Sequence, residues 1–202
     1  MAQADGTVSD RLIAFNRGRE AGRLARKYEA MRDNAFVFLR GTAHLFAQRT
    51  IELSLDGAAP AAWCCGDLHL ENFGSYLGDN GLAYFDINDF DEACLAPADW
   101  DMVRLAASVL VAAPTLGIGK ARALAFARAA IARYAGQLAA GKPRWLERQT
   151  ADGPVGDLIE GLRKRDPGDF LDKRTVLRKG ERRLRIDGQR ALAIAPADAK
   201  AI

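Results

Sequence analysis

The chain has 202 residues, of which 49% are hydrophobic and 27% are charged, and its formal net charge is +3. This composition describes a soluble globular protein with one sizeable core. No apolar run approaches the ~20 residues that a membrane-spanning helix needs, and the N-terminus lacks the basic and apolar regions of a signal peptide. We therefore expect a cytoplasmic protein with no membrane partner.

The chain contains three cysteines, Cys64, Cys65 and Cys94. Their number is odd, two of them are adjacent, and no C-x-x-C spacing occurs. This pattern favours buried free thiols over a disulfide framework or a zinc site.

The first predicted element is an amphipathic helix over residues 9–32, which Ser9 can cap. Its basic face could meet phosphate, although a solvated surface is the simpler interpretation. Residues 36–39 then form a short apolar run that ends at Arg40. A strand or loop there could bring Arg40 to an acidic centre, or pair it with a structural carboxylate.

Acidic side chains are concentrated between residues 65 and 101, although the chain as a whole is basic. The run at residues 61–65 has strand character, and Gly66 breaks it. Asp67 therefore stands at the exit of a buried strand. The acidic residues of this region are Asp67, Glu71, Asp79, Asp86, Asp89, Asp91, Glu92, Asp99 and Asp101.

Apolar runs at residues 73–77 and 82–87 flank an Asn-Gly turn, which is a strong signal for a β-hairpin. The hairpin should return the chain to the end of the first strand. It would then bring further polar side chains close to Asp67 and Asn72. These side chains are Asp86, Asn88, Asp89 and Asp91.

Carboxylates gathered at strand ends repel one another unless they share a cation. Mg²⁺ prefers oxygen ligands, and one or two protein carboxylates usually hold it together with the phosphates of a substrate. Asn72 adds an amide oxygen, and Asp67 would be free to accept a proton. The residues alone thus suggest a phosphoryl-transfer site, although Asp and Asn are also common in turns.

Two helices are predicted after the acidic centre, over residues 99–113 and 120–140. The first begins with acidic residues, as the helix dipole favours. A short turn joins the two helices, so they should pack antiparallel and form a floor under the acidic site.

From residue 141 onward the chain is basic, because residues 141–190 contain 14 Lys or Arg against 9 Asp or Glu. We therefore divide the chain into a domain over residues 1–140 and a basic extension over residues 141–202. The extension could bind an anionic partner, but few aromatics accompany its cations, so nucleic acid is not expected and a charged surface is simpler. A hairpin is predicted over residues 184–194, around Asp187-Gly188.

The sequence DLHLEN (residues 67–72) resembles the catalytic loop of the protein-kinase-like superfamily, most closely in the aminoglycoside phosphotransferase branch. Four motifs, FLRG, CGDLHLENFG, FDINDFDEA and DWDMVRLAAS, together resemble the uncharacterised bacterial family known as domain of unknown function 2252. The resemblance covers about residues 28–134. It implies an α+β fold similar to the C-lobe of a kinase, helical with a small β-hairpin that carries the acidic site.

The resemblance also implies roles for six residues. Asp67 is similar to the catalytic base that deprotonates an acceptor hydroxyl, and Asn72 and Asp89 to ligands of the Mg²⁺ (or Mn²⁺) that accompanies ATP. Asp86 competes with Asp89 for the last role, and we prefer Asp89. His69 would brace the loop by hydrogen bonds, and Arg40 is grouped with it on the cofactor side of the site.

We therefore expect an ATP-dependent phosphotransferase that acts on a hydroxyl group of a small molecule or a protein. The chain departs from the family pattern, because residues 143–202 contain neither a glycine-rich hairpin nor the Lys that follows it. It is thus expected to be truncated, and inactive unless a partner segment supplies that loop. Two alternatives stay open: a non-catalytic metal- or nucleotide-binding module, and a metal-dependent hydrolase in which the carboxylates activate water.

Overall fold

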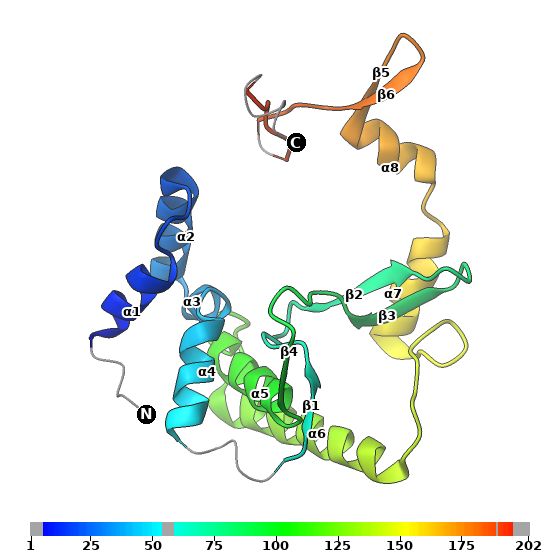
Figure 1. Cartoon of the computed structure of the whole chain (residues 1–202). Coiled ribbons are helices and arrows are strands. Elements are labelled where there is room, and N and C mark those ends of the chain that lie inside the picture. Colours follow the sequence, from blue (N-terminus) through cyan, green and yellow to red (C-terminus); the bar gives the residue numbers. More distant parts are fainter. Residues whose placement is uncertain (1–5, 54–58, 189, 196–202) are drawn as a thin grey trace. The chain divides into compact units, whose positions relative to one another are not determined.

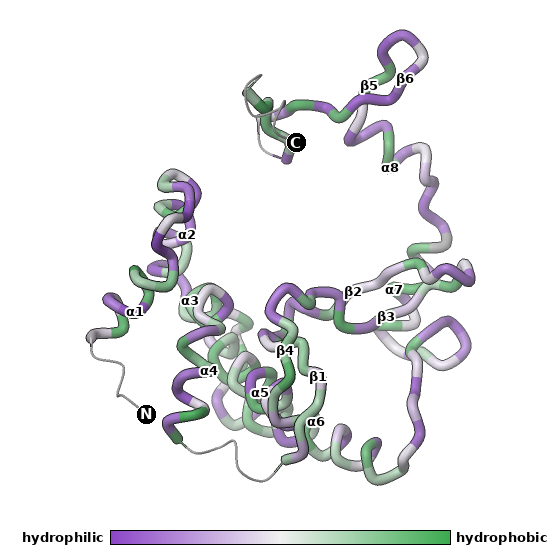
Figure 2. The backbone as a smooth tube through the Cα atoms, in the orientation of Figure 1, coloured by the Kyte–Doolittle hydropathy of each residue, from purple (hydrophilic) through white to green (hydrophobic). Residues whose placement is uncertain are grey.

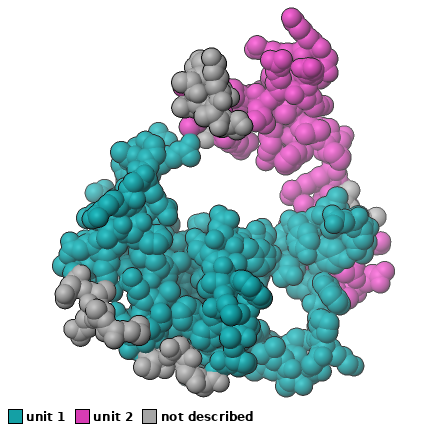
Figure 3. Space-filling model, in the orientation of Figure 1, with its two compact units in different colours: residues 1–146 teal, residues 147–202 magenta. Residues whose placement is uncertain are grey.

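The computed structural model describes residues 6–53, 59–188 and 190–195 (Figure 1). The chain divides into two compact units, residues 1–146 and 147–202 (Figure 3). In the described part, helices alternate with three small antiparallel strand pairs, so the predicted α+β class is confirmed. None of the helices found there is both long enough and apolar enough to cross a membrane.

Four helices begin the first unit. α1 is capped by Thr7, whose hydroxyl accepts from the backbone N–H of Asp10 while the Asp10 carboxylate accepts from the backbone of Thr7. α3 packs against both α2 and α5. The bounds are α1 Val8–Phe15, α2 Ala21–Asp33, α3 Ala35–Arg40 and α4 Ala43–Glu52.

The prediction of a single helix over residues 9–32 is wrong, because residues 16–20 separate two helices. The cap of the first helix is Thr7 rather than Ser9. Asn16 ends α1, and its fully buried side chain donates to the carbonyl of Leu12 (2.8 Å). Gly18 then adopts φ +83°, a conformation that favours glycine and reverses the chain. A short turn therefore separates α1 from α2.

The apolar run at residues 36–39 forms helix α3 rather than a strand or loop. Asn34 caps this helix, because its Oδ1 accepts from the backbone N–H groups of Phe36 (2.8 Å) and Val37 (3.2 Å). Arg40 is the last residue of the helix.

Two antiparallel strand pairs follow. β2 (Phe73–Leu77) and β3 (Ala83–Ile87) form the predicted hairpin, with Phe73 opposite Ile87. β1 (Ala61–Cys64) pairs with β4 (Cys94–Pro97), with Cys64 opposite Cys94. The second pairing brings the residues just after β1 beside the residues just before β4.

The core of the first unit lies between α5 (Trp100–Ala112) and α6 (Lys120–Ala140), and both predicted helices are confirmed. Figure 2 shows the apolar character of α5. Small side chains let the two helices approach closely. The buried cluster consists of Val109, Ala113, Ala123 and Ala127.

The described part of the second unit contains two helices and one hairpin, α7 (Gly153–Arg163), α8 (Pro167–Arg174), β5 (Thr175–Arg178) and β6 (Glu181–Leu184). Lys179 and Gly180 both have positive φ, as a two-residue hairpin turn requires. The hairpin predicted over residues 184–194 is therefore wrong: β6 ends at Leu184, and the residues described after it are not in strands. Gln189, inside that prediction, lies outside the described residues.

Some cations of the second unit are paired within the unit. Arg182 contacts the Asp172 carboxylate at 2.6 Å, and Arg183 contacts Glu181 at 3.4 Å. The basic character of this segment is thus partly balanced by its own carboxylates.

Candidate active site

The candidate site is built on the turn that follows β1. Gly66 has φ +88°, and a Cβ at this position would lie 2.1 Å from the carbonyl oxygen of Glu92, so only glycine fits. The Asp101 carboxylate accepts from the backbone N–H groups of Cys65 (2.7 Å) and Gly66 (3.0 Å). The first turn of α5 therefore holds the chain where it leaves the strand.

Asp67 forms a buried ion pair with Arg104 of α5. Only 7% of Asp67 and 2% of Arg104 are exposed. Arg104 Nε donates to Asp67 Oδ1 at 2.7 Å, and Nη2 contacts the same oxygen and donates to the carbonyl of Leu39. The guanidinium also lies 4.9 Å from the centre of the Phe46 ring. These contacts provide the partners that a buried charge pair needs.

The two carboxylate oxygens of Asp67 have different surroundings. Arg104 contacts Oδ1, whereas Oδ2 lies 3.9 Å from His69 Nε2. Burial raises the pKa of Asp67, and the charge and hydrogen bonds of Arg104 oppose that rise. Oδ2 is thus the atom of this carboxylate that can accept a proton from a ligand.

His69 and Asn72 are both buried and fix the shape of the loop. His69 Nδ1 accepts from the backbone N–H of Glu71 at 3.2 Å, so in the neutral ring Nε2 carries the proton. Burial lowers the pKa of His69, which favours the neutral ring. Asn72 Nδ2 donates to the backbone carbonyl of Asp67 at 3.0 Å.

Helix α5 also supports the loop from below. Ser108 is fully buried, and its hydroxyl accepts from the backbone N–H of Leu70 at 3.2 Å while it donates to the carbonyl of Leu105. Arg104 and Ser108 are one helical turn apart, so both reach the same loop.

A pocket of about 350 Å³ lies beside Asp67. His69 lines it, and its charged lining combines four carboxylates with two cations. Arg40 also forms an ion pair with Glu71. The charged lining residues are Asp67, Asp89, Asp91, Glu92, Lys27 and Arg40.

The two aspartates that compete for the role of metal ligand, Asp86 and Asp89, lie in different surroundings. Asp89 lines the pocket together with Asp67, whereas Asp86 does not. Asp86 is exposed on β3, and its Oδ1 accepts from the backbone N–H of Ile87 at 2.8 Å. A backbone hydrogen bond connects Asn72 to the segment that contains Asp89: the N–H of Asn88 donates to the carbonyl of Asn72 at 3.0 Å.

The residues present fit a metal that arrives with phosphates better than one held by protein alone. Among the described residues, no group of three or more His, Cys, Asp or Glu side chains could hold an ion. Mg²⁺ bound with a phosphorylated substrate needs only one or two protein ligands. Asp89 lines the pocket and meets that smaller requirement, whereas Asn72 does not line the pocket and is connected to this segment by the hydrogen bond from Asn88 to its backbone carbonyl.

The three cysteines are free thiols, and Cys64 and Cys65 are buried, as predicted. Burial raises the pKa of Cys65 to about 11, so this thiol stays protonated at neutral pH. The Cys65 thiol is therefore a poor nucleophile.

Sequence reasoning missed Arg104 and the capping role of Asp101. The sequence does contain an indication that Arg104 is buried. Arg104, Ser108 and Ala112 follow one another at four-residue spacing and so lie on one side of α5, and all three are buried. A charged residue on a buried helix face requires a partner. Asp67 is that partner.

The fold and the site define a mixed α+β protein with a buried acidic loop between a strand end and a helix. Residues 19–202 match the family described as "Uncharacterized protein conserved in bacteria (DUF2252)", and the chain belongs to this family, which confirms the family indicated by the four motifs. Comparison with curated proteins and with solved structures gives no match.

Proposed function

We propose that the pocket beside Asp67 is the site of an ATP-dependent phosphotransferase that acts on a hydroxyl group of a small molecule or a protein. The observation that carries this proposal is that Asp67 and Asp89 line one pocket together with Lys27 and Arg40. Carboxylates for a metal and cations for phosphates are the two requirements of phosphoryl transfer. The order Asp67, Asn72, Asp89 along the chain is also that of the kinase-like superfamily.

Each side chain has a role in this proposal. Oδ2 of Asp67 accepts the proton of the acceptor hydroxyl, because Arg104 occupies Oδ1. Arg104 is a positioning residue that orients the carboxylate and favours its ionised form. His69 holds the loop through its bond to the Glu71 backbone.

A divalent metal has a place in this site. Asp89 and Asn72 would hold Mg²⁺ or Mn²⁺, which when bound would neutralise the charge of the ATP phosphates. Arg40 lies on the same wall and can contact those phosphates, because it extends from the end of α3 into the pocket lining.

A non-catalytic metal- or nucleotide-binding module is the second candidate. The observation that favours it is the buried ion pair itself, since the charge and hydrogen bond of Arg104 oppose the rise in the pKa of Asp67 that burial causes, and so make the carboxylate a weaker base than it would be without Arg104. The two candidates bind the same ligands and differ only in turnover.

The test measures turnover and binding in the same variants. Asp67→Asn should keep the affinity for Mg-ATP within about threefold and lower the conversion of ATP to ADP at least about 100-fold, since an amide oxygen can still accept a hydrogen bond from Arg104 but cannot take the proton of the acceptor hydroxyl. Asp86→Asn, an exposed carboxylate outside the pocket, should change neither quantity. Binding without any turnover in the unmodified protein would favour the non-catalytic module.

A further inference from the structure

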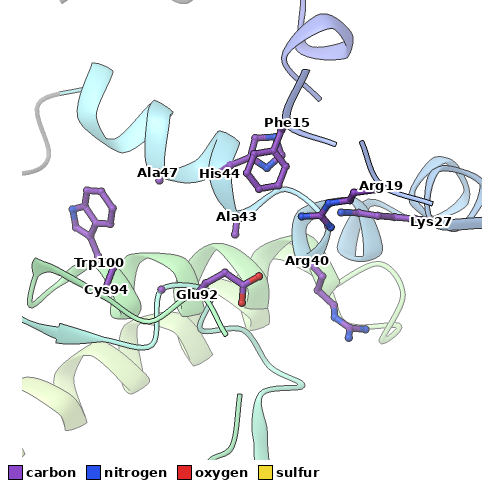
Figure 4. A pocket seen from close by; sticks show the side chains of 12 residues that line it. Phe15, Arg19, Lys27, Arg40, Ala43, His44, Ala47, Glu92, Cys94 and Trp100 are labelled. Carbon is purple, nitrogen blue, oxygen red and sulfur yellow. The ribbon is translucent and has the colours of Figure 1, made fainter. Parts of the chain in front are cut away.

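A second pocket of about 280 Å³ lies next to the first (Figure 4). Lys27, Arg40, Gly41 and Glu92 line both pockets, so the two spaces share a wall. The function proposed above makes no use of the remaining residues of this second pocket.

Two of the three cations that line the second pocket come from α2 and from the turn that precedes it. Arg19 lies in the turn between α1 and α2, and its guanidinium is 5.4 Å from the centre of the Phe15 ring. Lys27 lies in α2, and its Nζ donates to Oδ1 of the fully buried Asn16 at 3.4 Å. Figure 4 shows Arg19 and Lys27 side by side.

Neither of these two cations forms an ion pair among the described residues, although the charge of Glu92 acts on Lys27. Within the described ranges, neither Arg19 nor Lys27 has a carboxylate within 4.0 Å, whereas Arg40 is paired with Glu71. The second pocket is lined by three cations and the single carboxylate of Glu92, while the first pocket is lined by four carboxylates and two cations. A basic pocket thus adjoins an acidic one.

The wall of the second pocket also contains two buried nitrogen atoms with no hydrogen-bond partner in the described part of the chain. They are Nε2 of His44 and Nε1 of Trp100. His44 lies under Phe15, with ring centres 3.7 Å apart and nearly parallel. The Trp100 indole can only donate, and the neutral imidazole of His44 donates from Nε2 in one tautomer. An unpaired buried donor costs free energy that an acceptor entering the pocket recovers.

Every unsatisfied group here therefore favours a ligand rich in acceptors and negative charge. We propose that this second pocket binds the phosphate groups of a phosphorylated ligand through Arg19 and Lys27, and that the ligand reaches Asp67 across the shared wall. The assignment of ATP as that ligand rests on the proposed function. The α1–α2 turn and α2 thereby supply phosphate-binding cations in place of a glycine-rich loop.

The probe for this inference is inorganic tripolyphosphate, titrated calorimetrically into the full chain without a divalent metal. The double variant Arg19→Gln/Lys27→Gln should bind it at least about tenfold more weakly, because hydrogen bonds to charged groups are among the strongest in proteins. The matched control is Arg23→Gln/Arg26→Gln, which removes two exposed cations of α2 that line neither pocket. The control should bind like the unmodified protein.

Equal losses in both double variants would overturn the inference, since the effect would then come from overall charge. Because Lys27 contacts the buried Asn16, its replacement can also disturb the fold. Arg19→Gln alone avoids this problem, since Arg19 is exposed, and it should still weaken binding about threefold or more. An unchanged affinity in this single variant would contradict the inference as well.

A parallel titration with Mg-ATP separates this inference from the proposed function. Loss of Mg-ATP binding in Asp89→Asn, with no loss in Arg19→Gln, which changes a residue that lines the second pocket and not the first, would support the proposed function and overturn the second pocket. Loss of tripolyphosphate binding in the Arg19/Lys27 variant, with Mg-ATP binding unaffected by Asp89→Asn, would support the phosphate pocket and contradict the proposed function.

Discussion

Arg104 shows how one side chain links the fold of this protein to its candidate chemistry. It is 2% exposed, and its hydrogen bonds reach Asp67 in the loop after β1 and Leu39 in α3. A charge in such surroundings is tolerated only with a full set of partners. The same contacts that satisfy Arg104 also set the orientation of the Asp67 carboxylate.

Replacing Arg104 by methionine should destabilise the protein by about 3–5 kcal/mol, because Asp67 would be left as an uncompensated buried carboxylate. Urea unfolding measures the change. The double variant Asp67→Asn/Arg104→Met should recover about half of the loss or more, since it removes both charges. A cost below about 1 kcal/mol for Arg104→Met would show that the ion pair does not hold the loop.

The two histidines make the free energy of unfolding depend on pH. Burial is the main cause that lowers the pKa values of both His44 and His69, the two histidines of the chain. A histidine whose pKa is lower in the folded state loses stability as the pH falls from its unfolded value of ~6.5 toward the folded value, because the unfolded chain binds the proton first.

His44→Phe should therefore lose less stability than the unmodified protein between about pH 7.5 and about pH 5.5, since only His69 then contributes. The substitution keeps an aromatic ring against Phe15. Urea unfolding of both proteins at both pH values gives the comparison. An equal loss would mean that His44 does not titrate differently in the folded and unfolded states.

At the scale of elements, the turn at Gly66, directly after β1, is the least tolerant point of the site. Gly66→Ala should cost about 3 kcal/mol or more, because its Cβ would collide with the Glu92 backbone in addition to adopting positive φ. The control is Gly81→Ala in the β2–β3 turn, which has φ +76° and open space around it, and should cost only about 1–2 kcal/mol. Similar unfolding free energies for the two variants would contradict the tight approach at Gly66.

The elements that the sequence predicts well are those with a strong local pattern. The Asn80-Gly81 turn between two apolar runs predicts the β2–β3 hairpin. The apolar periodicity of residues 99–113 and 120–140 predicts helices α5 and α6. The run at residues 36–39 is too short for its period to distinguish a strand from a helix, and the Asn34 cap decides the outcome.

Other features depend on contacts that no local pattern contains. Asn16 ends α1 through a side chain that is completely buried, which periodicity cannot show. The loop holding Asp67 and Asn72 could be predicted from motif and strand ends, but its bond to Arg104 spans 37 residues. Likewise, the choice between Asp86 and Asp89 depends on tertiary structure, because Asp86 is exposed on β3 whereas Asp89 lies beyond the end of that strand and lines the pocket.

On the scale of the whole molecule, the first unit places opposite charges in adjacent spaces. The carboxylates of the acidic pocket come from the segments after β1 and β3, and two cations of the basic pocket, Arg19 and Lys27, come from the α1–α2 turn and from α2. Among the described residues, those that line either pocket belong to the first unit. This arrangement suits a ligand that carries a metal at one end of its phosphates and needs cations at the other.

The central claim is that the acidic pocket beside Asp67 binds ATP together with a divalent metal, and that Asp89 is a ligand of this metal. Isothermal titration of the full chain with ATP, in the presence and absence of Mg²⁺, tests it most directly, with Asp89→Asn and the matched Asp86→Asn as variants. We expect binding that requires Mg²⁺, that Asp86→Asn leaves unchanged, and that Asp89→Asn weakens at least about tenfold. No binding by the folded protein at about 1 mM ATP, or a loss caused by Asp86→Asn rather than Asp89→Asn, would contradict the account.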